Sequence, residues 1–111
     1  MGLKDILPIE DRLGFDEVYL CMEYMEYTLK RLVQSQQTTL TEEMIQFILY
    51  QLLSGVLFMH SADIIHRDLK PENILISKKL ELKIADMNLA KKEIINESNT
   101  YYVTSRPYRA P

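Results

Sequence analysis

The strongest constraint on the fold is the segment Thr41 to His60, which has the pattern of one long helix. Thr41 is a residue type that caps helices, and Glu42 and Glu43 follow it in the first turn, where the helix dipole favours acidic groups. Apolar residues then recur at spacings of four, four, four and three, as Met44, Ile48, Leu52, Val56 and Met59. Four more apolar residues widen this stripe: Phe47, Leu49, Leu53 and Leu57. The pattern predicts a helix about 30 Å long that is buried on most sides.

Shorter elements are expected on both sides of this helix. Val18–Tyr24 is rich in β-forming residues and continuously apolar, which predicts a buried strand. Residues 4–9 predict an edge strand or the tail of one, and residues 27–36 predict a short helix. After the long helix, Ile74–Ile76 and Leu82–Ala85 flank a lysine-bearing turn, which is typical of a β-hairpin.

Polar side chains lie at the two ends of this predicted hairpin. Asn73 precedes its first strand, Asp86 follows its second, and Asp68 lies five residues before Asn73. A tight hairpin brings its ends together, so the sequence predicts two carboxylates and an amide oxygen in one place, which are ligands suited to Mg²⁺. Lys70 adds a cation that can neutralise a phosphate. Phosphoryl transfer requires such a set: a group that orients the hydroxyl, oxygens for the metal, and positive charge.

Three motifs in this region resemble those of eukaryotic protein kinases. HRDLKPEN (His66–Asn73) matches the catalytic loop H-R-D-x-x-x-x-N at every fixed position, ADMNLA resembles the D-F-G motif with its flanks, and YRAP resembles the start of A-P-E. The segments EVYLCMEYM and LELKIADMNLAKK are similar to the mitogen-activated protein kinases, within the group that also holds cyclin-dependent and glycogen synthase kinases. The segment before YRAP also resembles the glycogen synthase kinases, which leaves the subfamily open.

The resemblance implies an α+β, protein-kinase-like fold that is partial. Residues 1–25 would hold the last N-lobe strands and the hinge, and residues 26–111 would run from the start of the helical C-lobe through the activation segment. The sequence contains no G-x-G-x-x-G loop and no V-A-I-K lysine, and the later C-lobe helices of the family are missing. We therefore expect a kinase fragment that is inactive by itself.

The resemblance also assigns catalytic roles, with ATP and Mg²⁺ as cofactors. Asp68 would accept the proton of the substrate hydroxyl, and Lys70 would pair with the γ-phosphate of ATP. Asn73 and Asp86 would hold Mg²⁺. The adenine ring would be bound by backbone groups of Glu23 and Met25 in the hinge. Met22 would be the gatekeeper residue, and Leu75 would pack under the ring.

Regulation is implied by the resemblance of Thr100-Tyr101-Tyr102 to a Thr-x-Tyr activation motif. Arg67 would bind a phosphate on Thr100 or Tyr102 and so order the activation segment by charge-assisted pairing. His66 is expected to be a packed structural residue rather than a base.

Two departures from the family pattern bear on activity. Met87 and Asn88 replace the Phe and Gly of D-F-G; Met can fill the apolar slot, and Asn tolerates a positive φ better than most residues. Pro107 stands where the family usually has Trp or Tyr, near the site that binds the substrate peptide, so proline-directed specificity is in question.

Composition narrows the partners and the compartment. A net charge of −3 points to neither nucleic acid nor an anionic membrane surface. A single cysteine, Cys21, fits an intracellular compartment, cytoplasm or nucleus, and no apolar run approaches the roughly 18–20 residues that span a bilayer. The expected partners are protein substrates with Ser or Thr and an upstream activating kinase. The alternatives are a non-catalytic, pseudokinase-like interaction module or a gene fragment without function.

Overall fold

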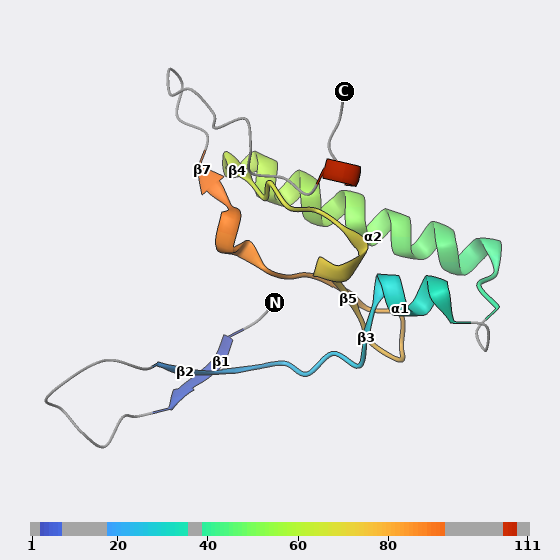
Figure 1. Ribbon diagram of the computed structural model, residues 1–111, viewed down its shortest axis with the longest axis horizontal. Helices are drawn as coiled ribbons and strands as arrows, with labels where there is room; N and C mark the ends of the chain where they lie inside the picture. Colours follow the sequence, from blue (N-terminus) through green and yellow to red (C-terminus); the bar gives the residue numbers. More distant parts are fainter. Residues whose placement is uncertain (1–2, 8–17, 36–38, 93–105, 109–111) are drawn as a thin grey trace, which may run out of the picture.

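A single long helix lies beside several small antiparallel sheets in the computed structural model (Figure 1). The structure describes residues 3–7, 18–35, 39–92 and 106–108. The elements of these residues, in chain order, are β1 (Leu3–Leu7), β2 (Tyr19–Met22), β3 (Tyr27–Thr28), α1 (Leu29–Gln34), α2 (Glu42–Ser61), β4 (Ile64–Ile65), the 3₁₀ turn η1 (Pro71–Asn73), β5 (Ile74–Ile76), β6 (Leu82–Ile84), η2 (Met87–Leu89), β7 (Lys91–Lys92) and η3 (Arg106–Tyr108).

The long helix begins and ends close to where its sequence pattern predicts. Thr41 is the N-cap, and its hydroxyl accepts a hydrogen bond from the Met44 amide at 3.4 Å. The helix packs on β6, where a Cβ added to Gly55 would lie 3.0 Å from Cδ1 of Ile84. The absence of a side chain at Gly55 therefore allows the close approach of helix and strand.

The predicted hairpin is present as β5 and β6, which pair antiparallel with Ile74 opposite Ile84. β3 adds a third strand on the other edge of β5. Gln51 of α2 fixes the hairpin turn, because its amide donates to the Leu80 carbonyl at 2.8 Å and accepts from the Leu82 amide at 3.0 Å. The small core beneath this sheet is formed by Leu32, Ile48 and Ile76.

The predicted strand at residues 18–24 forms as β2, but the prediction that it is buried is wrong. β2 pairs with β1 in a separate two-stranded sheet, and all four of its residues are exposed. In the described part of the chain this sheet projects away from α2 and the hairpin (Figure 1). A continuous apolar run thus marks a strand whose large side chains, Tyr19, Leu20 and Met22, stay about half exposed.

The prediction that α2 is buried on most sides is also wrong. Within the helix, Ile48 and Met59 are buried. Large apolar side chains on the rest of its surface are exposed: Ile45, Phe47, Leu49, Tyr50, Leu53, Leu57 and Phe58. By length and composition alone, α2 could cross a membrane, which corrects the expectation that no apolar segment approaches that length. Its packed face, however, lies on the hairpin through Gln51 and Gly55.

Candidate active site

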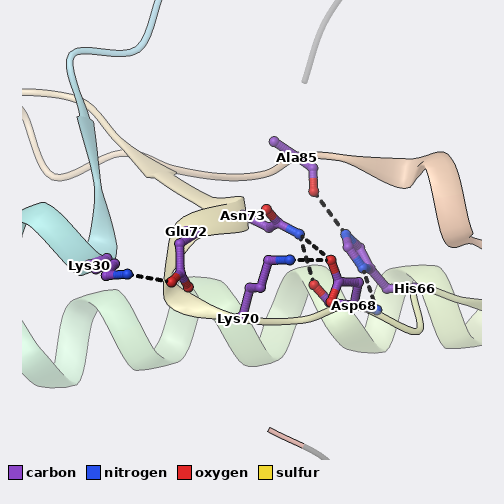
Figure 2. A network of polar contacts seen from close by, with 7 residues as sticks. All are labelled: Lys30, His66, Asp68, Lys70, Glu72, Asn73 and Ala85. Carbon is purple, nitrogen blue, oxygen red and sulfur yellow. Dashed lines mark hydrogen bonds and ion pairs between the residues drawn. The ribbon is translucent and has the colours of Figure 1, made fainter. Parts of the chain in front are cut away.

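The segment between β4 and η1 carries the residues of the predicted catalytic loop, and His66 anchors its beginning (Figure 2). His66 is 1% exposed. Its Nε2 lies 2.9 Å from the carbonyl oxygen of Ala85, and its Nδ1 accepts from the Asp68 amide at 3.2 Å. A neutral ring with the proton on Nε2 satisfies both contacts. His66 therefore ties the loop to the end of β6, which is a structural role.

Asp68 is the centre of a hydrogen-bonded cluster beside this histidine. The residue is 6% exposed, and its Oδ2 lies 2.5 Å from Nζ of Lys70. Nδ2 of Asn73 donates to the Asp68 carbonyl at 2.9 Å and to Oδ2 at 3.1 Å. The hydrogen bond to Asp68 is the main cause that raises the pKa of Lys70, against the opposing effect of desolvation. The structure thus brings three of the predicted site residues together, with the Lys70 ammonium held in its charged form.

Asn73 and Asp86 lie at the base of the hairpin, where a metal ion was predicted. The Ala85 amide donates to the Asn73 carbonyl at 2.9 Å, so the residue before Asp86 is bonded to Asn73. Because the Asn73 amide nitrogen is directed at Asp68, its Oδ1 is the oxygen left to meet a cation. An amide oxygen and a carboxylate are the donors that Mg²⁺ takes, with water and substrate phosphates completing its coordination. The described residues contain no group of three His, Cys, Asp or Glu that could hold a metal unaided.

The backbone of the metal motif differs from the sequence-based expectation. Asp86 has φ of 62° and ψ of 65°, which is the left-handed region, and it is exposed. The expectation placed a positive φ at Asn88, but Asn88 lies inside η2 and is not among the described residues with positive φ. Asp tolerates this conformation better than most residues. The unusual backbone is therefore at the predicted metal ligand itself.

The predicted adenine contacts do not share one cavity. A cavity of about 790 Å³ between β2, α2 and β6 includes Met22 and Asp86 in its wall, but not Glu23, Met25 or Leu75. Glu23 instead lies 3.6 Å from Nζ of Lys83 on β6. Met25 precedes β3 and is half-buried, as is Leu75 in β5. The hinge residues follow one another along the chain toward β3, and their role in binding adenine stays a prediction.

The predicted regulatory residues are described in part. Arg67 has a positive φ of 65°, and its Nε donates to the Leu89 carbonyl at 2.6 Å, which joins the catalytic loop to η2. Thr100 and Tyr102 lie outside the described residues. Phosphate binding by Arg67 therefore stays a prediction.

One polar contact next to the cluster was not predicted. Nζ of Lys30 in α1 lies 2.7 Å from Oε1 of Glu72 in η1 (Figure 2). The hydrogen bond between them is the main cause that lowers the pKa of Glu72 and raises that of Lys30. The two residues are 42 positions apart, and no local pattern signals such a pair.

Comparison with known families identifies the class of protein. The protein kinase domain family matches residues 9–111, and the chain belongs to that family. Over its whole length it is 44% identical to Mitogen-activated protein kinase 3 of Arabidopsis thaliana and 41% identical to Mitogen-activated protein kinase 1 of Oryza sativa subsp. japonica. These comparisons confirm the resemblance to the mitogen-activated protein kinases.

Solved structures confirm the kinase-like fold. A chain in the crystal structure of the yeast RNA Pol II CTD kinase CTDK-1 complex superposes with a TM-score of 0.87 at 31% identity. The match covers 96% of this chain and 34% of that one. This chain likewise spans 30% and 28% of the two plant kinases. The α+β architecture is therefore that of part of a kinase domain.

Proposed function

We propose that this chain supplies the catalytic segment of a protein serine/threonine kinase, which transfers the γ-phosphate of ATP to Ser and Thr hydroxyls of proteins. The observation that carries the proposal is the cluster of Asp68, Lys70 and Asn73, in which Asp68 and Asn73 are buried and Lys70 is partly exposed. A carboxylate is fixed there between a cation and an amide, at the base of a hairpin that ends in Asp86. Family membership supports the same chemistry.

In this proposal each residue has one role in phosphate transfer. Asp68 orients the substrate hydroxyl and accepts its proton, which is the part of phosphoryl transfer that a base performs. Lys70 lies beside it and pairs with the transferred phosphate. Asn73 and Asp86 hold Mg²⁺, which supplies positive charge to the phosphates when bound. Adenine is bound at the hinge by Met22, Glu23, Met25 and Leu75.

The proposed setting follows the family. The protein would act inside the cell, in the cytoplasm or nucleus, on protein substrates. An upstream kinase would phosphorylate Thr100 and Tyr102, and Arg67 would bind the phosphate. The 111-residue chain alone would not turn over ATP, because the loop and lysine that position the phosphates in the family are not in its sequence.

The decisive experiment compares three Asp→Asn variants of the protein at its natural length. Asp68→Asn and Asp86→Asn should each lower Mg-ATP-dependent phosphorylation of mixed Ser/Thr peptides by at least about 100-fold, because a base or a metal-bound charge is lost. Asp63→Asn is the matched control: Asp63 is exposed and has φ of 57°, close to that of Asp86, but lies at the end of α2. Activity of Asp86→Asn within about twofold of wild type would exclude the metal-site assignment.

A second candidate, a non-catalytic interaction module, is favoured by the exposed apolar side chains of α2. Exposed apolar patches of that kind mark interaction surfaces. Wild-type protein that binds a kinase partner but gives no phosphate transfer, with or without the Asp68→Asn change, would support this candidate over the first.

A further inference from the structure

Asn88 carries a side chain at a position where the D-F-G motif has none. The motif ends in glycine, whereas this chain has an asparagine there, inside η2. The left-handed backbone lies at Asp86, so position 88 does not need a residue that tolerates a positive φ. A requirement of the backbone therefore does not account for Asn88, and its side chain calls for another role.

Asn88 and Asp86 line the same cavity of about 790 Å³, whose wall is otherwise mostly apolar. The other polar side chains of this wall have partners. Gln51 bonds to the hairpin turn through both ends of its amide, and Lys83 lies 3.6 Å from Glu23. Asp86 and Asn88 are exposed, and neither makes a side-chain hydrogen bond or ion pair with another described residue. These two side chains can therefore meet a bound molecule without giving up a contact.

The chemistry of this pair suits a divalent cation. A carboxylate and an amide oxygen are hard donors of the kind that Mg²⁺ and Mn²⁺ take. The charge of Asp86 would repel the phosphates of a nucleotide unless a cation lay between them. That charge also contributes to the raised pKa of Lys70, after the larger effect of the hydrogen bond to Asp68. The polar end of the cavity therefore acts electrostatically on the cluster where phosphate transfer is proposed.

We propose that the amide oxygen of Asn88 is a further ligand for the divalent cation that Asn73 and Asp86 are proposed to hold. This role rests on the proposed kinase function and adds to its metal site an oxygen that glycine cannot supply. A further protein oxygen takes the place of one water on the cation, so the metal is held more tightly than by Asn73 and Asp86 alone. Asn88 then acts on the nucleotide only through the cation.

The test measures Mn²⁺ binding to the protein at its natural length, with a non-hydrolysable ATP analogue, from the electron paramagnetic resonance signal of the unbound ion. Asn88→Leu removes the oxygen at nearly constant volume and should weaken Mn²⁺ binding at least about tenfold, since even an outer-shell partner contributes that much to metal affinity. Asn88→Asp keeps an oxygen and adds charge, so it should bind Mn²⁺ at least as tightly as wild type. Gln46→Leu is the matched control, because Gln46 carries an exposed amide on α2 and does not line the cavity.

Binding of a fluorescent ATP analogue, with Mg²⁺ or with EDTA, shows which group Asn88 contacts. Asn88→Leu should weaken nucleotide binding when Mg²⁺ is present and leave it unchanged in EDTA. Equal weakening in both conditions would overturn the inference, because the amide would then bind phosphate.

The Mn²⁺ titrations also separate this role from the kinase function. Unchanged Mn²⁺ affinity in both Asn88→Leu and Asn88→Gly would overturn the role of Asn88, and a loss in Asp86→Asn alongside it would leave the proposed metal site standing. Circular dichroism would show that these variants fold. Weaker Mn²⁺ binding in both Asn88 variants, without any phosphate transfer by wild type, would uphold the ligand and reject the kinase function. Wild type that binds no Mn²⁺ would overturn both the ligand and the metal site.

Discussion

Replacing His66 with Ala tests whether this histidine holds the catalytic loop in place. Two polar groups lose their partner in the variant: the Asp68 amide, which is buried, and the Ala85 carbonyl, which is partly buried. Leaving a buried polar group unsatisfied costs about 1–3 kcal/mol, and the more exposed carbonyl belongs at the lower end. The lost ring also leaves a cavity in a site that is 1% exposed. We expect the free energy of unfolding to fall by about 3–4 kcal/mol, which is large for one substitution.

The assay is urea unfolding followed by far-ultraviolet circular dichroism, because α2 dominates the helical signal and the chain has no tryptophan. His66→Asn refines the result. The Asn oxygen can replace Nδ1 as the acceptor for the Asp68 amide, but Asn cannot reach Ala85, so its loss should be about half that of Ala.

The chain contains its own control in His60, the other histidine. His60 is exposed in the last turn of α2, where a histidine contributes at most about 1 kcal/mol through the helix dipole. If His66→Ala and His60→Ala lower the free energy of unfolding equally, the anchoring role of His66 is wrong.

Three further outcomes are expected. Mass spectrometry of activated protein should find phosphate on Thr100 and Tyr102, and high activity with both unmodified would reject these sites. The pKa of Glu72 is lowered in the folded state, chiefly by Lys30, so the pair stabilises the fold above the usual glutamate pKa and this contribution is lost as pH falls. Lys30→Ala should therefore make the free energy of unfolding less dependent on pH in the acid range. An unchanged pH dependence would contradict this. Leu57 and Phe58 are 70% and 74% exposed, so the double variant Leu57→Lys, Phe58→Gln of the 111-residue chain should associate less and scatter less light. Scattering equal to that of wild type would show that another surface drives association.

Local features of the fold could be predicted from the sequence. The Thr41 cap and the apolar spacing after it define α2 to within a residue at each end, because capping and helical periodicity act over one or two turns. The β5–β6 hairpin is equally local, since its strands are joined by a short turn. The proximity of Asn73 to the end of β6 follows from that hairpin, as the bond from the Ala85 amide shows.

Burial could not be predicted, because it depends on neighbours that are distant in the sequence. β2 and the outer face of α2 are apolar, yet many of their side chains stay exposed. Side-chain contacts between distant segments were missed for the same reason. The Lys30–Glu72 pair and the bond from Gln51 to Leu80 join residues 42 and 29 positions apart. The left-handed backbone lies at Asp86 rather than Asn88, because the chain turns at Asp86 from β6 into η2.

The cluster around Asp68 depends on α2 through a continuous series of contacts. Gln51 fixes the hairpin turn, and Gly55 allows Ile84 of β6 to approach the helix closely. The end of β6 then presents the Ala85 carbonyl to His66, whose other nitrogen holds the amide of Asp68.

Substitutions on the two faces of α2 should therefore have different consequences. A Cβ at position 55 meets Cδ1 of Ile84 at 3.0 Å, so a bulky side chain there would press on β6, whose end presents the Ala85 carbonyl to His66. A substitution on the exposed face at Leu57, which lines neither the cavity of Asp86 nor the one that includes Lys70, should change association without changing the site. The packed face of α2 therefore supports the proposed active site, although no residue of the helix belongs to the cluster itself.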